Sequence, residues 1–294
     1  MQIGVAGLGA MGANIAVRLL EVGHQVTVWN RNADKTKPLA AVGAKVAASP
    51  AALADAVEAV ITILTDGTAI DAVYNGPNGL LFGNVKGKLF IEMSTVAPKV
   101  ETELAPKVRA KGAAYVECPV GGSTGPARQG KLLGLMGAEP ADAERARPIL
   151  EQLCRKVEHC GPVGTGAAMK LAINLPLMVA WQAYGEAFAI ARSVGWDAKR
   201  LVDLFVESNG GNKALTARAE MIVKLLDNKD PGATTFSIAN GMKDLRTMVA
   251  TGESFGADMR ATKAALSGFE DAVQHGQGGS DGANMAVYWS GRKK

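Results

Sequence analysis

The sequence predicts an α/β fold over its first half and an all-helical fold over its second half. In the first half, short apolar runs such as Ala59 to Leu64, typical of buried strands, alternate with helical patterns. After the glycine-rich stretch at residues 161–166, little strand signal remains. Alternation of this kind implies a doubly wound sheet. We therefore expect a first domain at residues 1–163 and an all-helical domain at 164–294, joined by a long helix.

Strands and helices are expected to alternate along the first domain. The expected strands are Gln2 to Ala6, Gln25 to Trp29, Lys45 to Ala47, Ala59 to Leu64, Lys88 to Glu92, Ala114 to Cys118, Leu132 to Met136 and Lys156 to His159. The expected helices are one that ends near Val22, Ala33 to Val42, Pro50 to Val57, Pro98 to Lys111 and Pro140 to Leu153.

In the second domain, helices are expected at Ala167 to Val194, Lys199 to Glu207, Ala214 to Leu226, Ser237 to Thr251 and Met259 to His275. The first of these is mostly apolar, and Pro176 could bend it. A helix of this composition must be buried, either within its own domain or against a second subunit.

A glycine-rich segment, Gly7-Leu8-Gly9-Ala10-Met11-Gly12, joins the first strand to the first helix. In a GxGxxG segment of this kind, the first glycine permits a tight turn and the second lets a pyrophosphate approach the backbone. The third glycine lets the helix pack closely on the strand, and the helix N-terminus offers free N–H groups to the phosphates. The segment predicts a Rossmann-type dinucleotide site; a glycine-rich turn without a ligand is the alternative.

The end of the second strand bears on the choice of cofactor. Rossmann domains for NAD usually carry an acidic residue there, but this chain has Asn30, Arg31 and Asn32, with no acid before Asp34. A guanidinium pairs with a 2′-phosphate. We therefore expect Asn30 and Arg31 to contact the cofactor and NADP(H) to be favoured over NAD(H). The alternative is that Arg31 is a solvated surface residue.

Composition excludes several other classes of protein. A net charge of +4 is too small to suggest nucleic acid as a partner. No apolar run reaches the length of a membrane span, and the N-terminus lacks the features of a signal peptide. The three cysteines lack metal-ligand spacing, and the three histidines are isolated. We expect a cytoplasmic protein with reduced thiols and no metal, nucleic acid or membrane partner.

Ligands of a doubly wound sheet bind beyond the carboxyl ends of its strands, where three segments of this chain are expected. The segment after the fourth strand brings Leu64 and Thr65, which we expect to bind the cofactor, and the next one brings Ser94, which we expect to bind the substrate. The third, Glu117 to Pro126, is rich in glycine, and its backbone N–H groups could hold a carboxylate. Ordinary loops are the alternative.

Lys170 and Asn174 lie one turn apart on the expected long helix, on one face. Partial desolvation lowers the pKa of a lysine in an apolar helix, so that Lys170 could exchange a proton near neutrality. Asn174 could orient the ammonium group or a substrate hydroxyl. A lysine that reaches out to solvent and an asparagine that packs between helices are the alternatives.

Together, these motifs resemble the β-hydroxyacid dehydrogenase family, which includes 3-hydroxyisobutyrate dehydrogenase, tartronate semialdehyde reductase and glyoxylate/succinic semialdehyde reductases. The resemblance covers almost the whole chain. Its motifs are GLGAMG at 7–12, MSTV at 93–96, the segment 117–123, GxxGxGxxxKxxxN at 161–174 and the segment from Phe236 to Leu245.

The resemblance implies roles for the matching residues and an oligomeric protein, usually a dimer or tetramer. Lys170 would be the general acid/base, and Asn174 would position it. The other implied roles are the nicotinamide side of the site for Thr95, the substrate carboxylate for Gly121, Gly122 and Ser123, the cofactor for Lys243, and the lining of the cleft for Phe236 and Asp244.

The chain departs from the family pattern at two positions, with Glu117 in place of Asp and Gly121 in place of Ser. Loss of the hydroxyl at 121 removes one hydrogen bond to a carboxylate, and Ser123 could replace it. Arg128 could add a further contact to an anion or lie on the surface. The substrate of this chain could therefore differ from that of the best-known members.

The expected function is transfer of a hydride between NAD(P) and a small β-hydroxy acid or its aldehyde acid. One alternative is a dehydrogenase of 3-hydroxy amino acids such as threonine or serine. Another is an imine reductase, against which Lys170 argues. A third is a non-catalytic NADP-binding sensor, against which the Lys170/Asn174 pair and the lack of a basic tract argue.

Overall fold

The computed structural model describes residues 1–292 and divides the chain into two compact units, Met1–Leu171 and Ala172–Lys294. The division falls within helix α8 (Thr165–Ala191). The functional domains expected at 1–163 and 164–294 stay a prediction. The last two residues of the second domain, 293 and 294, lie outside the described part of the chain.

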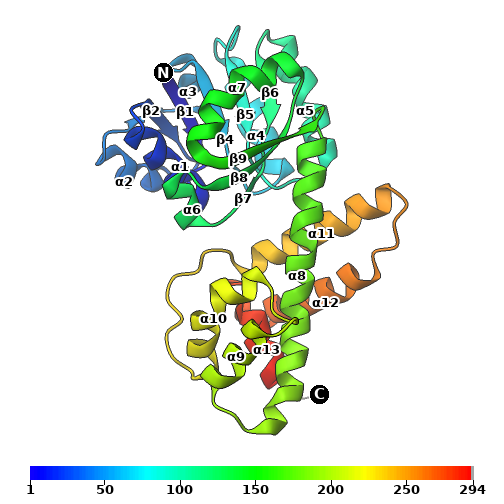
Figure 1. Ribbon diagram of the computed structural model, residues 1–294. Coiled ribbons are helices and arrows are strands. Elements are labelled where there is room, and N and C mark those ends of the chain that lie inside the picture. The colour runs from blue at the N-terminus through cyan, green and yellow to red at the C-terminus, as the bar shows by residue number, and fades with distance from the viewer. Residues whose placement is uncertain (293–294) are drawn as a thin grey trace. The chain divides into compact units, whose positions relative to one another are not determined.

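The first unit contains a sheet with strand order β3-β2-β1-β4-β5-β6-β8-β7, in which β9 pairs with β8 (Figure 1). The first six strands run parallel to one another, which confirms the doubly wound α/β fold. Strand β8 runs antiparallel to β6 and β7, because the short connection before it holds no full crossover helix. The strands are β1 (Gln2–Ala6), β2 (Gln25–Trp29), β3 (Lys45–Val46), β4 (Ala59–Thr62), β5 (Leu89–Glu92), β6 (Ala114–Glu117), β7 (Val120–Gly121), β8 (Leu132–Gly137) and β9 (Cys154–Gly161).

Helices cover both faces of this sheet. They are α1 (Ala10–Glu21), the 3-10 turn η1 (Ala33–Thr36), α2 (Lys37–Ala40), α3 (Pro50–Asp55), α4 (Gly67–Asn75), the 3-10 turn η2 (Leu80–Phe82), α5 (Pro98–Ala110), α6 (Thr124–Gln129) and α7 (Pro140–Leu153). Side chains of each strand alternate between two cores. On β5, for example, Ile91 packs into the core with α1 and α7, whereas Phe90 packs into the core with α3, α4 and α5.

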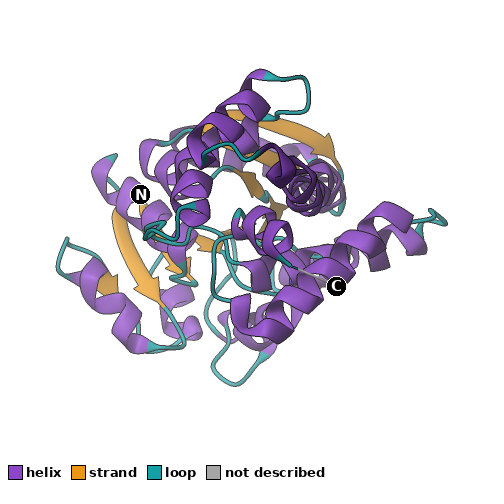
Figure 2. Ribbon diagram, turned by 90° about the horizontal axis from the view of Figure 1, so that it is seen from below, coloured by secondary structure: helices purple, strands orange, loops and turns teal. Residues whose placement is uncertain are grey.

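The second unit is helical: within residues 172–292, no strand occurs beyond an isolated bridge between Ser237 and Asp281. Figure 2 shows the contrast between the strands of the sheet and the purely helical part. Besides the rest of α8, its elements are η3 (Arg192–Val194), α9 (Ala198–Glu207), α10 (Lys213–Leu226), α11 (Ile238–Ser254), α12 (Arg260–Ala272), the turn η4 (Val273–Gln277) and α13 (Asn284–Gly291). The expected all-helical second half is confirmed.

Helix α8 is continuous through Pro176. One part of its surface is buried: Phe188 is fully covered, and Gly185 packs so closely on α13 that a Cβ there would lie 2.5 Å from Cβ of Trp289. Met169 and Ile173 remain 45% and 42% exposed. The helix is therefore only partly covered within the chain. Among the described residues, no helix has the length and apolar character that crossing a membrane requires.

Candidate functional site

The glycine-rich turn between β1 and α1 needs two of its glycines for packing. Gly7 has φ +98°, and a Cβ there would lie 2.2 Å from the carbonyl oxygen of Ile63. At Gly12 a Cβ would lie 2.0 Å from the carbonyl oxygen of Gly7. Gly9 differs, since no atom lies within 4 Å of the position its Cβ would take. The turn therefore leaves open space at Gly9, at the N-terminus of α1.

Two hydrogen bonds fix this turn to the end of β2. The Gly7 N–H donates to the carbonyl of Trp29 over 3.1 Å, and the Leu8 N–H donates to Oδ1 of Asn30 over 2.9 Å. Gly9, the N-cap residue of α1, has no side chain to cap the helix. The first N–H groups of α1 are thus left to an external acceptor, as an anion site at a helix N-terminus requires.

Beyond Asn30, the end of β2 presents a basic and an amide side chain. Arg31 is exposed. The Asn32 side chain accepts a hydrogen bond from the N–H of Asp34, whose carboxylate pairs with Lys37 over 2.6 Å. The first acid after the strand is therefore bound to a lysine of the next helix.

Glu92, which the sequence analysis did not single out as functional, connects the loops after β4 and β5. The Ser94 Oγ donates to Glu92 over 2.5 Å and accepts from the N–H of Leu64 over 2.7 Å. The Ser94 N–H and the Thr62 hydroxyl also donate to Glu92. The buried carboxyl thereby holds Leu64 and Ser94 together at adjacent strand ends. A charged residue ending an apolar strand is the signal that could have identified it.

Two further acids lie near Glu92. Burial raises the pKa of Glu101 well above its usual range, and the field of Glu92 adds to this effect. The Tyr115 hydroxyl donates a hydrogen bond to Glu101 over 2.5 Å. Burial also raises the pKa of Glu92, against the hydrogen bonds from Ser94. The third acid, Glu117, lies at the end of β6.

Gly121 and Gly122 differ in how much space they leave. A Cβ at Gly121 would make an ordinary contact with Leu133, 3.5 Å away. Gly122 has φ +129°, and a Cβ there would lie 2.8 Å from Leu132. Ser123 takes the N-cap position of α6 but makes no side-chain hydrogen bond to that helix. Of these two positions, only 122 requires glycine, because any other residue there would have a strained backbone.

Arg128 is a surface residue that joins two helices. Its guanidinium on α6 pairs with Glu21 on α1 over 2.7 Å. Of the two roles considered for Arg128, this contact favours the structural one.

Lys170 lies in the second turn of α8 and is only 7% exposed, whereas Asn174, one turn further along, is half-buried. The first turn of α8 is bound by Glu117. Its Oε1 accepts hydrogen bonds from the N–H groups of Gly164 (2.7 Å), Gly166 (2.8 Å) and Ala167 (3.4 Å). Burial raises the pKa of Glu117 to about 7, although these three hydrogen bonds oppose the rise.

In the second unit, Lys243 and Asp244 lie on α11 and form an ion pair of 2.8 Å. Asp244 is buried, and Lys243 is partly exposed. Phe236 precedes α11 and is half-buried. Phe236, Lys243 and Asp244 thus all belong to the second unit.

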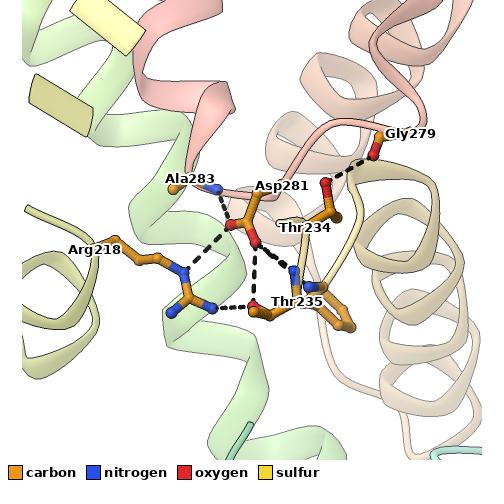
Figure 3. A network of polar contacts seen from close by, with 7 residues as sticks. Arg218, Thr234, Thr235, Gly279, Asp281 and Ala283 are labelled. Atoms are coloured by element: carbon orange, nitrogen blue, oxygen red, sulfur yellow. Dashed lines mark hydrogen bonds and ion pairs between the residues drawn. The ribbon is translucent and has the colours of Figure 1, made fainter. Parts of the chain in front are cut away.

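Asp281 holds the segment that contains Phe236 (Figure 3). Its carboxylate accepts hydrogen bonds from the N–H and hydroxyl of Thr235 at 3.0 and 3.1 Å, and from the N–H of Phe236 at 3.5 Å. It also pairs with Arg218 of α10 over 3.3 Å and accepts from the N–H of Ala283. Neither Asp281 nor Arg218 stood out in the sequence, because the contact joins residues far apart in the chain.

In the first unit, the glycine-rich turn, the loops at 64–65 and 94–95 and the start of the 121–123 loop all follow the carboxyl ends of strands β1, β4, β5 and β6. Within residues 1–292, no group of three or more His, Cys, Asp or Glu side chains could hold a metal ion. A doubly wound sheet with an uncapped glycine-rich helix N-terminus is typical of dinucleotide-binding proteins, and the buried Lys170 on α8 is suited to proton transfer.

Comparison with known proteins narrows this class. Residues 2–161 match the family model for the NAD binding domain of 6-phosphogluconate dehydrogenase, and residues 164–289 match the model for the NAD-binding of NADP-dependent 3-hydroxyisobutyrate dehydrogenase. Glyoxylate/succinic semialdehyde reductase 1 of Arabidopsis thaliana is 31% identical over 281 residues, 96% of either chain.

Two solved structures are similar over nearly the whole chain. Mycobacterium tuberculosis 3-hydroxyisobutyrate dehydrogenase with L-serine has a TM-score of 0.84 at 26% identity, covering 98% of both chains. Psf3 in complex with NADP+ and 2-OPP has a TM-score of 0.87 at 26% identity, covering 97% of this chain and 99% of that one. The chain belongs to the β-hydroxyacid dehydrogenase family and is an NAD(P)-binding oxidoreductase that acts on CH–OH groups.

Proposed function

We propose that this protein transfers a hydride between NADP(H) and a small β-hydroxy acid or its aldehyde acid, with Lys170 as the general acid/base. The observation that carries the proposal is the burial of Lys170, 7% exposed, in the second turn of the helix that starts against the sheet. A buried lysine is suited to proton transfer in a site shielded from water.

The bound nicotinamide supplies the hydride in reduction and accepts it in oxidation. In reduction, Lys170 donates a proton to the carbonyl oxygen of the substrate as the carbonyl carbon takes up the hydride. In oxidation, Lys170 accepts the proton of the hydroxyl group. Its ammonium group also stabilises the negative charge that develops on the substrate oxygen. Asn174 orients the ammonium group and the substrate.

The glycine-rich turn is proposed to bind the cofactor phosphates. The open space at Gly9 and the uncapped N–H groups of α1 fit a pyrophosphate. The proposed cofactor contacts are Gly7, Leu8, Gly9, Ala10, Met11, Gly12, Asn30, Arg31, Leu64, Thr65, Thr95 and Lys243.

The preference for NADP(H) rests on Arg31. It is exposed at the end of β2, where its guanidinium is available to a 2′-phosphate. The nearest acid, Asp34, is paired with Lys37. This arrangement favours a phosphate over a ribose hydroxyl at the strand end.

The substrate carboxylate is proposed to bind the loop of Gly121, Gly122 and Ser123, and Phe236 and Asp244 to line the substrate site. For Ser94 the structure favours a different role from direct substrate binding. Its hydroxyl is buried and already bound to Glu92 and Leu64, so it holds the two loops in place. The names of the relatives favour 3-hydroxyisobutyrate, glyoxylate or succinic semialdehyde as the kind of substrate.

A homodimer or homotetramer is proposed from the exposed apolar side chains of α8, since Met169, Ile173 and Ile190 lie uncovered on it. Sedimentation equilibrium tests this, and a monomer at micromolar concentration would overturn it.

A cytoplasmic location also stays a prediction, because the relatives include mitochondrial and chloroplastic proteins.

Lys170→Met tests the assignment of the general acid/base, because methionine keeps the length of the side chain without its charge. We expect turnover to fall about 10²- to 10⁴-fold, while cofactor binding, followed by nicotinamide fluorescence, is unchanged. Lys111→Met, at an exposed lysine, serves as the matched control. Turnover at the level of this control would contradict the assignment.

A further inference from the structure

Glu117 joins two parts of the proposed site. It ends strand β6, directly before the glycine-rich loop at 120–123, and its carboxylate binds the first turn of α8. Gly137, its partner on β8, makes room for it, since a Cβ there would lie 2.2 Å from Oε1 of Glu117. Gly166 likewise lets α8 approach β8, because its Cβ would lie 2.3 Å from the carbonyl oxygen of Leu135.

Lys170 lies on α8 one turn beyond the N–H groups that the Glu117 carboxylate binds. Lys170 follows Gly166 by four residues, which corresponds to about 6 Å along the helix axis. The N-terminus of a helix carries a partial positive charge that disfavours a nearby cation and falls off within about the first turn. An ionised carboxylate bound to the same N–H groups offsets that charge.

We propose that Glu117 is a positioning residue for Lys170: it fixes the first turn of α8, and its negative charge supports the protonated lysine that the reduction needs. The inference rests on the proposed function, in which Lys170 is the general acid. A side chain with the shape of Glu117 but without its negative charge would therefore not fulfil this role.

The charge of Glu117 changes near neutral pH. Burial raises its pKa to about 7, and the field of Glu92 adds to the rise. Other titratable groups that interact with Glu117 are Glu101, Cys118 and Cys160, all of which have raised pKa values. Burial raises the pKa of each of these groups, and Glu117, with a pKa of about 7, is the group whose carboxylate binds the α8 N-terminus directly.

The test compares Glu117→Gln with Glu117→Asp. Glutamine keeps the size of the side chain and removes the charge, whereas aspartate keeps the charge and shortens the side chain. If Glu117 only fills space, the glutamine variant is the more active. The proposal predicts the opposite order: kcat for aldehyde acid reduction falls about 10- to 100-fold in Glu117→Gln and less in Glu117→Asp, with unchanged cofactor binding.

The pH profile of kcat gives a second readout. The wild-type enzyme should lose activity as pH falls through about 7, the glutamine variant should lack this acidic limb, and the aspartate variant should keep one. Glu158→Gln, at an exposed acid on β9, is the matched control and should behave as wild type. Wild-type kcat in Glu117→Gln, or an aspartate variant less active than the glutamine variant, would overturn the proposal.

Two measurements separate failure of this inference from failure of the proposed function. If Lys170→Met abolishes turnover while Glu117→Gln does not change it, only the role of Glu117 is wrong; if Lys170→Met is active, the proposed function itself is wrong.

Thermal unfolding reports on Glu117 without turnover. Because its folded-state pKa is raised, its stabilising contribution is complete below the unfolded pKa and is lost as pH rises through about 7. The Tm of Glu117→Gln should therefore fall less than that of wild type between pH 5 and 8.

Discussion

The side chain of Asn30 accepts a hydrogen bond from the backbone N–H of Leu8 over 2.9 Å. This bond joins the end of β2, where the adenosine ribose of a dinucleotide is expected, to the turn expected to hold the phosphates. The two parts of the proposed cofactor site are thus held as one unit before any ligand binds.

Replacing Asn30 should weaken the binding of both cofactors equally. Asn30→Ala leaves the Leu8 N–H without its acceptor, at a cost of about 1 kcal/mol. We expect the dissociation constants of NADPH and NADH to rise by a similar factor of about five. Fluorescence titration of each cofactor checks this, and a selective loss of only one cofactor would show that Asn30 reads the ribose directly.

Replacing Arg31 should discriminate between the cofactors. In Arg31→Asp, the charge-assisted contact with the 2′-phosphate becomes a repulsion, so NADPH binding should weaken about 10- to 100-fold. NADH binding should stay the same or improve. The matched control is Arg155→Asp, at an exposed arginine on β9, at the opposite end of the sheet from β2. Equal weakening of both cofactors by Arg31→Asp would refute the predicted preference.

The two glycines at 121 and 122 should respond differently to serine. Gly121→Ser has room for its Cβ and places a hydroxyl in the proposed carboxylate loop. We expect the KM for the aldehyde acid to fall about fivefold, the value of one hydrogen bond. Gly122→Ser instead strains the backbone and collides with Leu132, so it should lower both Tm and kcat. A Gly121→Ser variant with unchanged KM for every acid tested would remove this loop from the proposed substrate site.

Asp281 should matter for stability and for the segment that carries Phe236. Asp281→Ala leaves Arg218 and several backbone N–H groups without their partner, which should lower the free energy of unfolding by about 3 kcal/mol. Urea denaturation measures this. Asp258→Ala breaks an exposed pair with Arg260 and should change stability little. Equal effects of the two substitutions would contradict the importance of the buried contact.

The parts of the fold that are determined by residues close together in the sequence were predicted from the sequence. The spacing of Gly7, Gly9 and Gly12 predicts the turn after β1, in which Gly7 takes a positive φ and Gly12 packs against the carbonyl oxygen of Gly7. The apolar runs predict the central strands. Helices α4, α6 and α13 and strand β7 were missed, since elements of two to nine residues carry little periodic pattern.

Contacts between distant residues could not be predicted in the same way. Glu92, Glu117 and Asp281 find their partners in loops or helices that follow other strands or helices, and only the folded chain brings them together. The sequence did mark Glu117 as a departure from the family motif, but not its contact with the first turn of α8. Its partners are backbone N–H groups, which any residue except proline supplies.

The most direct test of the central claim is to follow the absorbance of the reduced nicotinamide while the purified protein is offered glyoxylate, succinic semialdehyde or tartronate semialdehyde. NADPH and NADH are each tried with every acid. The account predicts oxidation of NADPH by at least one of these acids, with a lower rate for NADH and a loss of turnover in Lys170→Met. Binding of NADPH without oxidation by any of these acids, and without reduction of NADP+ by 3-hydroxyisobutyrate, would contradict it.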